Sequence, residues 1–198
     1  VVTAPAGTRV SASAVSGDVS VRNIKGDVSA VTVSGDVAVT GAAQVSVAKT
    51  VSGDVTLTDI TTSGAIGAAA VSGDVRFTRV KAAQISSESV SGTIELADTT
   101  TERATLKSVS GDIRYTGAIV RGGRYELQSH SGDVQLGTDG PAGFELQAST
   151  FSGSIRTAPS TVLRAATTSS RSVRGTVGDG SAVLVVTTFS GDIAIVAR

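Results

Sequence analysis

Apolar and polar residues alternate along most of the chain, in short runs that centre on a recurring five-residue motif. The clearest copies read Val-Ser-Gly-Asp-Val and begin at Val15, Val33, Val51 and Val71. Around each copy the apolar positions recur at every second residue, which is typical of a β-strand with one buried face. No run of about 12 residues has a helical period. The pattern therefore predicts an all-β protein.

Looser copies of the motif continue to the C-terminus. They begin at Val90, Val109, His130, Phe151 and Phe189, and a degenerate copy is read at 173–177. Successive motif glycines are 18 to 21 residues apart, except that an interval of 38 residues separates the last two, Gly153 and Gly191, and contains the degenerate copy. The repeat leaves no room for a linker. It predicts one domain over residues 1–198, with residues 1–14 as an atypical first coil.

A second strand is predicted between successive motifs, so each repeat supplies two short strands joined by turns. Such small units bury their apolar faces only by stacking on one another. The pattern therefore favours a parallel β-solenoid of about ten coils, each of about 18–22 residues. An antiparallel sandwich is the alternative, because a strand spacing of about 8–12 residues also suits it. The chain ends three residues after Ile195, which predicts an open, uncapped last coil.

The motif aspartates form the most regular set of candidate functional residues. In a solenoid, with Val and Gly of the motif facing inward and Ser and Asp outward, they would stack about 4.8 Å apart along one edge. Arg76, Arg114 and Arg156 follow this position by two residues and would offset the repulsion. A cation-binding ladder is one hypothesis, and a bend in which Asp bonds backbone amides is the other. The row comprises Asp18, Asp36, Asp54, Asp74, Asp112, Asp133 and Asp192, interrupted by Thr93 and Ser154.

Composition narrows the function classes. The formal net charge is zero, so there is no electrostatic reason to expect nucleic acid as a partner. Cysteine is absent and His130 is the single histidine, which argues against a thiolate or histidine metal site and gives no reason to expect a cofactor. No run approaches the roughly 20 apolar residues of a membrane span, so direct membrane insertion is not expected. Because the sequence begins at Val1, a trimmed or processed product is expected.

Catalysis finds little support in the residues. His130 takes the place of the motif's first Val and is expected to pack at a coil corner. It does not face Ser131, because neighbouring residues of a strand point to opposite faces. Glycoside cleavage needs two carboxylates about 5–10 Å apart, and the aspartate row singles out no pair. The only tyrosines, Tyr115 and Tyr125, are in phase with core positions.

The repeats resemble a bacterial family of β-strand-repeat proteins that is labelled as adhesins and is a domain of unknown function. Further passages resemble its later coils and its ending: 123–127 leading into 129–134, 151–155, and 173–182 running into 188–193. The resemblance implies a right-handed parallel β-helix and a cell-envelope, cell-surface or secreted setting. The family has no established catalytic residues, so none are carried over.

These observations lead to an expected function. The chain is expected to be a non-enzymatic rod for adhesion, interaction or scaffolding, with a surface polymer or a protein as partner. One alternative is a β-helix that binds or cleaves carbohydrate. The other is a filament subunit that self-associates end to end through open coils. Function is expected where the repeat is broken, at Thr93, His130 and Ser154 and at the turns around Gly122 and Gly140.

Overall fold

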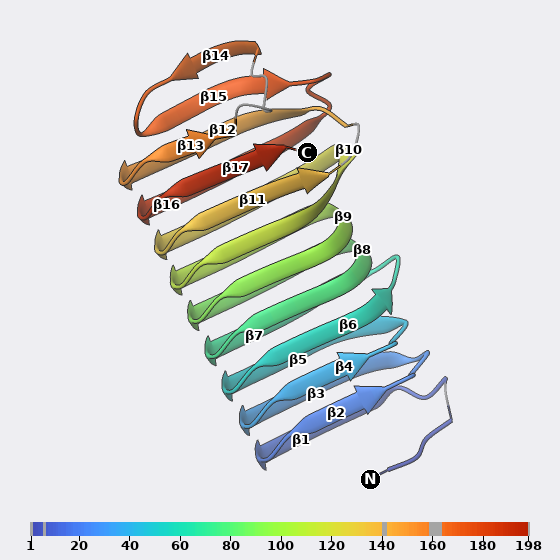
Figure 1. Cartoon of the computed structure of the whole chain (residues 1–198). Coiled ribbons are helices and arrows are strands. Elements are labelled where there is room, and N and C mark those ends of the chain that lie inside the picture. The colour runs from blue at the N-terminus through green and yellow to red at the C-terminus, as the bar shows by residue number, and fades with distance from the viewer. Residues whose placement is uncertain (1, 6, 140–141, 159–163, 198) are drawn as a thin grey trace.

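Parallel β-strands wind into a stack of coils (Figure 1). The computed structural model describes residues 2–5, 7–139, 142–158 and 164–197, and these contain strands and turns but no helix. Seven coils follow one another in chain order, and each has one strand before the motif and one after it. We number these coils 1 to 7 from the N-terminus.

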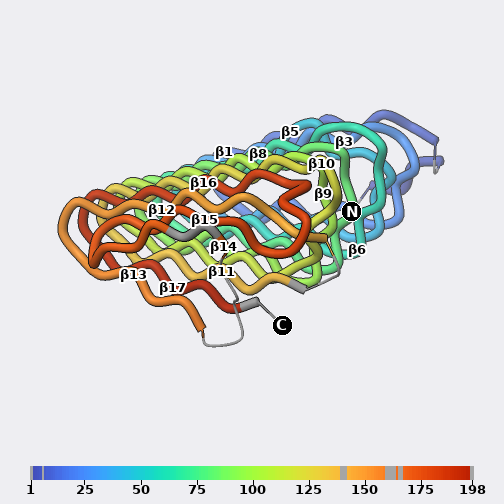
Figure 2. The backbone as a smooth tube through the Cα atoms, turned by 90° about the horizontal axis from the view of Figure 1, so that it is seen from above, coloured from blue at the N-terminus to red at the C-terminus, as the bar shows by residue number. Residues whose placement is uncertain are grey.

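The strands before the motif form one sheet, which we call sheet one. They are β1 (Val10–Ser16), β3 (Asp27–Ser34), β5 (Gln44–Ser52), β7 (Ala65–Ser72) and the second halves of β8 (Val75–Ser91), β9 (Ile94–Ser110) and β10 (Ile113–Ser131). The strands after the motif form sheet two. They are β2 (Val19–Arg22), β4 (Val37–Thr40), β6 (Val55–Thr61), the first halves of β8, β9 and β10, and β11 (Val134–Asp139). Figure 2 shows the coils lying over one another in two layers.

The register between coils places each motif on the next. Ser34 pairs with Ser52, and Ser52 pairs with Ser72. The expected all-β parallel solenoid is therefore confirmed. The expected count of about ten coils is wrong, because the solenoid has about seven turns. Only residues up to β11 continue the winding in chain order.

The chain then stacks two further rungs out of order. β12 (Phe144–Ser152) and β13 (Ile155–Thr157) form the outer one, which we call rung 9. β16 (Ala182–Ser190) lies between β10 and β12, and β17 (Ile193–Ala197) lies between β11 and β13, which makes the C-terminal segment rung 8. Figure 1 shows β17, at the C-terminus, between β11 and β13.

Two expectations about this end of the chain are wrong. Residues 173–177 are not a repeat copy, because β15 (Ser172–Val177) runs antiparallel to β12 and, with β14 (Arg164–Thr168), covers the outer side of rung 9 in sheet one. The last coil is not an open end either, because Ile195 is fully buried between β11 and β13. Each motif copy marks one rung, but the order of the copies in the sequence is not the order of the rungs in the stack.

The core fills the space between the two sheets. Ala48 and Thr50 point inward from sheet one, and Val55 and Leu57 point inward from sheet two. Val51, the first residue of that motif, points outward. The prediction that the motif's first Val faces the core is wrong, because the Ser-Gly-Asp turn between the sheets interrupts the two-residue period. At the turn Gly53 has φ +137°, and a Cβ there would lie 2.2 Å from the carbonyl oxygen of Gly35.

The N-terminal coil is more regular than expected. β1 pairs with β3 in the same parallel register as later coils, beginning with Val10 opposite Val28. Irregular backbone is confined to the described residues before Val10, where Thr8 donates a turn hydrogen bond to the carbonyl of Pro5. The atypical segment is thus shorter than residues 1–14. The predicted turn around Gly140 lies outside the described residues.

Candidate interaction surface

An exposed line of apolar side chains runs along sheet one beside the motif turn. We call it the ridge. The valines of coils 2 to 6 are 43–48% exposed, whereas the residue before each of them on the strand is buried. In stacking order the ridge comprises Val15, Val33, Val51, Val71, Val90, Val109, His130, Phe189 and Phe151.

The ridge changes from aliphatic to aromatic at coil 7. The imidazole of His130 stacks on the ring of Phe189 with centroids 5.0 Å apart, and Phe189 stacks on Phe151 at 4.8 Å. The last two rings are 48% and 66% exposed. The sequence suggested that His130 packs as an inward corner residue, and that is wrong, since the histidine is exposed. Phe151 and Phe189 become neighbours only because rung 8 is inserted below rung 9.

Two shallow grooves follow the ridge. Between coils 2 and 6 the groove is lined by Val31, Lys49, Ala69, Glu88 and Lys107 on one side and by ridge valines on the other. The second groove lies beside the three rings, where Gln128, Ser149 and Thr187 add amide and hydroxyl groups. Sequence reasoning missed both grooves, because it assigned the motif's first residue to the core.

A second row of polar side chains lies under the ridge and faces inward. The hydroxyl of Thr32 donates to the carbonyl of Gly17 at 3.1 Å, and that of Thr50 donates to Gly35 at 3.0 Å. Ser129, Thr188 and Thr150 make the corresponding bonds to Gly111, Gly132 and Gly191. In this row Ala70 has no hydroxyl, and the hydroxyl of Ser108 has no partner among the described residues. The row holds one motif turn to the next.

The aspartate row also connects neighbouring coils. The carboxylate of Asp18 accepts a hydrogen bond from the backbone N–H of Asp36 at 3.0 Å, and Asp36 accepts one from Asp54 at 2.8 Å. The same bond recurs further up the stack, with Asp54, Asp74, Asp112, Asp133 and Asp192 as acceptors. The bend interpretation placed these amides next to the aspartate in the chain. They belong instead to the equivalent residue of the next coil, so the row has a structural role, and the cation ladder stays a prediction.

The two breaks in the aspartate row have different positions. Thr93 interrupts the row between Asp74 and Asp112. Its backbone N–H donates a hydrogen bond to the carboxylate of Asp74, but among the described residues its side chain accepts none from the next coil. Ser154 ends the row instead of interrupting it, because rung 8 stacks between Asp133 and Ser154. Asp192 accepts hydrogen bonds from both the amide and the hydroxyl of Ser154, and these lower the pKa of Asp192.

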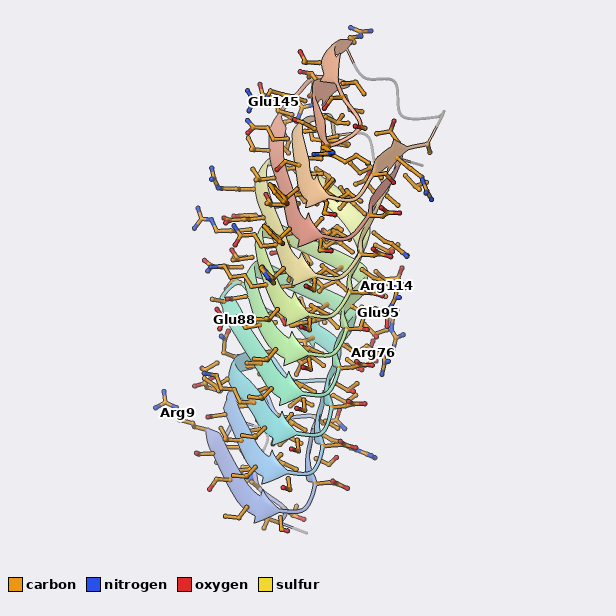
Figure 3. All side chains as sticks on the ribbon, turned by 90° about the vertical axis from the view of Figure 1, so that its left-hand side faces the viewer. Arg9, Arg76, Glu88, Glu95, Arg114 and Glu145 are labelled. Atoms are coloured by element: carbon orange, nitrogen blue, oxygen red, sulfur yellow. The ribbon has the colours of Figure 1, made fainter. Side chains whose placement is uncertain are left out.

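Arginines accompany this row on sheet two. Arg76 pairs with Asp74 at 3.1 Å and with Glu95 at 3.0 Å, and Arg114 pairs with Asp112 at 2.8 Å. Arg156 lies 3.6 Å from Asp192. Figure 3 shows Arg76, Glu95 and Arg114 together on one face of the stack and Glu88 on the opposite face. The charges of these three arginines are therefore compensated within the molecule.

The tyrosines belong to the core, as the sequence predicted. Both are fully buried, and their rings meet edge to face with centroids 5.6 Å apart. The hydroxyl of Tyr125 donates to the carbonyl of Thr101 at 2.6 Å and accepts from the amide of Val120 at 3.0 Å. Burial raises the pKa of Tyr115 and of Tyr125.

A family of domains matches almost the whole sequence. The Toastrack family, described as Toastrack DUF4097, matches residues 2–196. The chain belongs to the Toastrack family. No curated protein and no solved structure matches it. The family is a domain of unknown function, as the resemblance implied, and the adhesin label is no part of this match.

The Toastrack chain offers limited chemistry elsewhere. A groove at the other corner of coils 3 to 6 is lined by Thr61, Lys81, Thr100 and Arg121 and contains one carboxylate, Glu102. The predicted turn around Gly122 is wrong, because Gly122 lies within β10; the neighbouring Arg121 forms an ion pair with Asp179 at 3.0 Å. His130, Ser131 and Asp133 share no hydrogen bond in the described part of the chain.

Metal and membrane features are likewise sparse. Within residues 2–5, 7–139, 142–158 and 164–197, no group of three or more His, Cys, Asp or Glu side chains is placed to hold a metal ion. No helix of the described chain has the length and hydropathy of a membrane span. The ridge is therefore the most distinctive surface feature of the Toastrack chain.

Proposed function

We propose that this chain is a non-enzymatic rod of the cell envelope or cell surface that acts by adhesion or scaffolding through its ridge. The ridge is the observation that carries the proposal. Contiguous exposed apolar patches of more than about a few hundred Å² often mark binding sites. Each coil adds one more exposed side chain to the same line, so the surface is built by the repeat itself.

The aromatic end of the ridge is the part best suited to a surface polymer. Phe151 and Phe189 present apolar ring edges, and the groove beside them contributes the hydroxyls of Ser149 and Thr187 and the amide of Gln128. A polyhydroxylated chain has both C–H patches and hydroxyl groups to match these. Each contact is weak, and several rods acting on one polymer would gain affinity by multivalency.

The extracytoplasmic setting of the proposal rests on the family resemblance. The non-enzymatic part is supported by the corner groove, since Glu102 is the one carboxylate in its lining, whereas glycoside cleavage uses a pair. The charges beside the aspartate row are already engaged in ion pairs on sheet two.

Sedimentation with insoluble polymers tests the proposal. Purified protein is mixed with bacterial cell-wall sacculi, cellulose or chitin, and the pelleted fraction is measured. A Phe151→Ser/Phe189→Ser variant is expected to lose binding about tenfold, because the two rings together lose apolar contact worth roughly 1.4 kcal/mol. Thr56→Ala/Thr58→Ala on sheet two is the matched control and keeps binding. Undiminished binding by the phenylalanine variant, or release of new reducing ends from these glycans, contradicts the proposal.

A further inference from the structure

The aliphatic part of the ridge poses a separate question, namely what covers it. Between coils 2 and 6 the outer face of sheet one is apolar or small around its centre, and coil 4 carries only Ala65, Gly67, Ala69 and Val71. On coil 4 itself no side chain larger than valine projects outward, so another flat surface can approach closely at that coil. A patch of this kind on sheet one points to a protein face that is itself flat.

Two pairs of opposite charges are placed symmetrically about coil 4, whereas Lys107 of coil 6 has the apolar Val31 as its counterpart in coil 2. On the row next to the ridge, Lys49 lies one coil before it and Glu88 one coil after it. On the outermost row, Asp27 lies two coils before it and Arg103 two coils after it. Lys49, Glu88 and Arg103 make no ion pair within the part of the chain that the structure describes. Asp27 lies 3.8 Å from the exposed Arg9, so Arg103 of a second copy would join or replace that pair.

We propose that the occupant is a second copy of this chain, packed antiparallel through coils 2–6 of sheet one about a two-fold axis at coil 4. The axis lies along the strands, so each row of one copy faces the same row of the other with the coil order reversed. Lys49 then meets Glu88 of the second copy, and Arg103 meets Asp27. Each pair occurs twice, which gives four ion pairs around the valine ridges.

The two registers shifted toward the C-terminus are less favourable. Moving the axis by half a coil toward the C-terminus places Lys49 opposite Lys107, and moving it by a full coil places Glu88 opposite itself. Like charges in direct opposition cost affinity. With the axis at coil 4, the residues beyond the contact are Arg9 and Arg124, which carry like charge, so the interface ends at coils 2 and 6.

The size of the face fits a modest dimer. Five coils extend about 24 Å along the stack and seven residues about 23 Å along the strands, which gives about 550 Å² on each copy. The total of about 1,100 Å² lies near the lower limit for a specific interface. A dissociation constant in the micromolar range is expected. Rungs 8 and 9 extend beyond the contact, so the aromatic end of each ridge stays exposed, one at each end of the dimer.

This inference goes beyond the proposed function and does not depend on polymer binding. Sedimentation equilibrium of the whole chain between about 1 and 500 μM is expected to show a monomer–dimer equilibrium. Lys49→Glu and Glu88→Lys are each expected to weaken the dimer at least tenfold, and the two substitutions together restore it. Lys81→Glu, at the other corner of the stack, is the matched control. A chain that stays monomeric at 500 μM, or a double variant that dimerises no better than the single ones, overturns the proposal.

Cross-linking tests the register, because the chain has no cysteine of its own. Facing sheets lie about 10 Å apart, too far for a disulfide but within reach of a short bis-maleimide. Val71→Cys alone is expected to cross-link, and so is a mixture of Val51→Cys with Val90→Cys. Val51→Cys by itself should give little product. Equal product from Val51→Cys alone overturns the antiparallel register.

Discussion

Coils 1 to 7 and rungs 8 and 9 make the same hydrogen bonds at the motif, but only coils 1 to 7 stack in the order of the chain. In both regions the motif aspartate accepts an amide N–H from the neighbouring rung, and an inward threonine donates to a motif glycine carbonyl. In coils 1 to 7 that neighbour is about 20 residues away in the chain. Between Asp133 and Asp192 it is 59 residues away. Contacts of one kind therefore hold together two regions that differ in chain order.

Removal of residues 182–198 is the strongest test of this difference. Rung 8 provides the parallel partner of rung 9, so its loss leaves β12 and β13 detached from β10 and β11. Amide hydrogen exchange is expected to show that residues 142–181 lose protection almost completely, while coils 2 to 5 stay protected. Removal of residues 1–5, which precede β1, is the control. If residues 142–181 remain protected in the truncated chain, rung 9 does not depend on rung 8 for its place in the stack.

Substitution of a motif glycine tests stacking within the regular coils. A Cβ at Gly73 would lie 1.9 Å from the carbonyl oxygen of Gly53, whereas at Gly17 it would meet nothing within 4 Å. Both glycines have positive φ, at +149° and +128°, so both substitutions to Ala carry backbone strain of about 1–3 kcal/mol. Only Gly73→Ala adds the clash, and its total cost is expected to exceed about 4 kcal/mol in denaturant unfolding. Equal losses for Gly73→Ala and Gly17→Ala would show that coil stacking does not constrain the motif glycine.

The inward hydroxyls give a smaller effect that should be the same in both regions. Thr50→Val and Thr188→Val each leave a glycine carbonyl without its hydroxyl donor, and each is expected to cost about 1 kcal/mol in urea unfolding. Ala70→Ser restores the missing hydroxyl of the row and is expected to stabilise by about 0.5–1 kcal/mol. A much larger loss for Thr188→Val would mean that the out-of-order rungs depend on this bond more than the regular coils do.

The sequence was sufficient to predict the solenoid, because the motif recurs at one spacing and in one polarity. It could not predict the position of Ile195 inside the stack, since the repeat is the same whichever rung lies next to it. It also misplaced Val51, because alternation was counted through a turn where Gly53 has a positive φ. The ridge was missed for that reason. The stacking of Phe151 on Phe189 depended on chain order, so no local signal could have found it.

The smallest effect expected is at the contact between rungs 8 and 9, and it depends on pH. The amide and hydroxyl of Ser154, with Arg156 nearby, hold the pKa of Asp192 below its ordinary value. Because the folded-state pKa is the lower one, the ionised carboxylate contributes stability above the ordinary value of 3.8, and this is lost as the pH falls through the folded-state pKa. Asp192→Asn keeps an acceptor for Ser154 but removes the titrating group.

Unfolding curves between about pH 5 and pH 2 provide the measurement. The unmodified chain is expected to lose stability over this interval more steeply than the Asp192→Asn variant. Because Ser154 precedes β13, amide hydrogen exchange in that strand should show the difference first. Asp179→Asn is the matched control. The pKa of Asp179 is also lowered, by hydrogen bonds from Ser181 and Gly143, but these lie at a turn away from β13. If the Asp192→Asn curve runs parallel to that of the unmodified chain, the hydrogen bonds from Ser154 do not stabilise the contact between rungs 8 and 9. The parallel pairing of β13 with β17 then holds rung 9 in place.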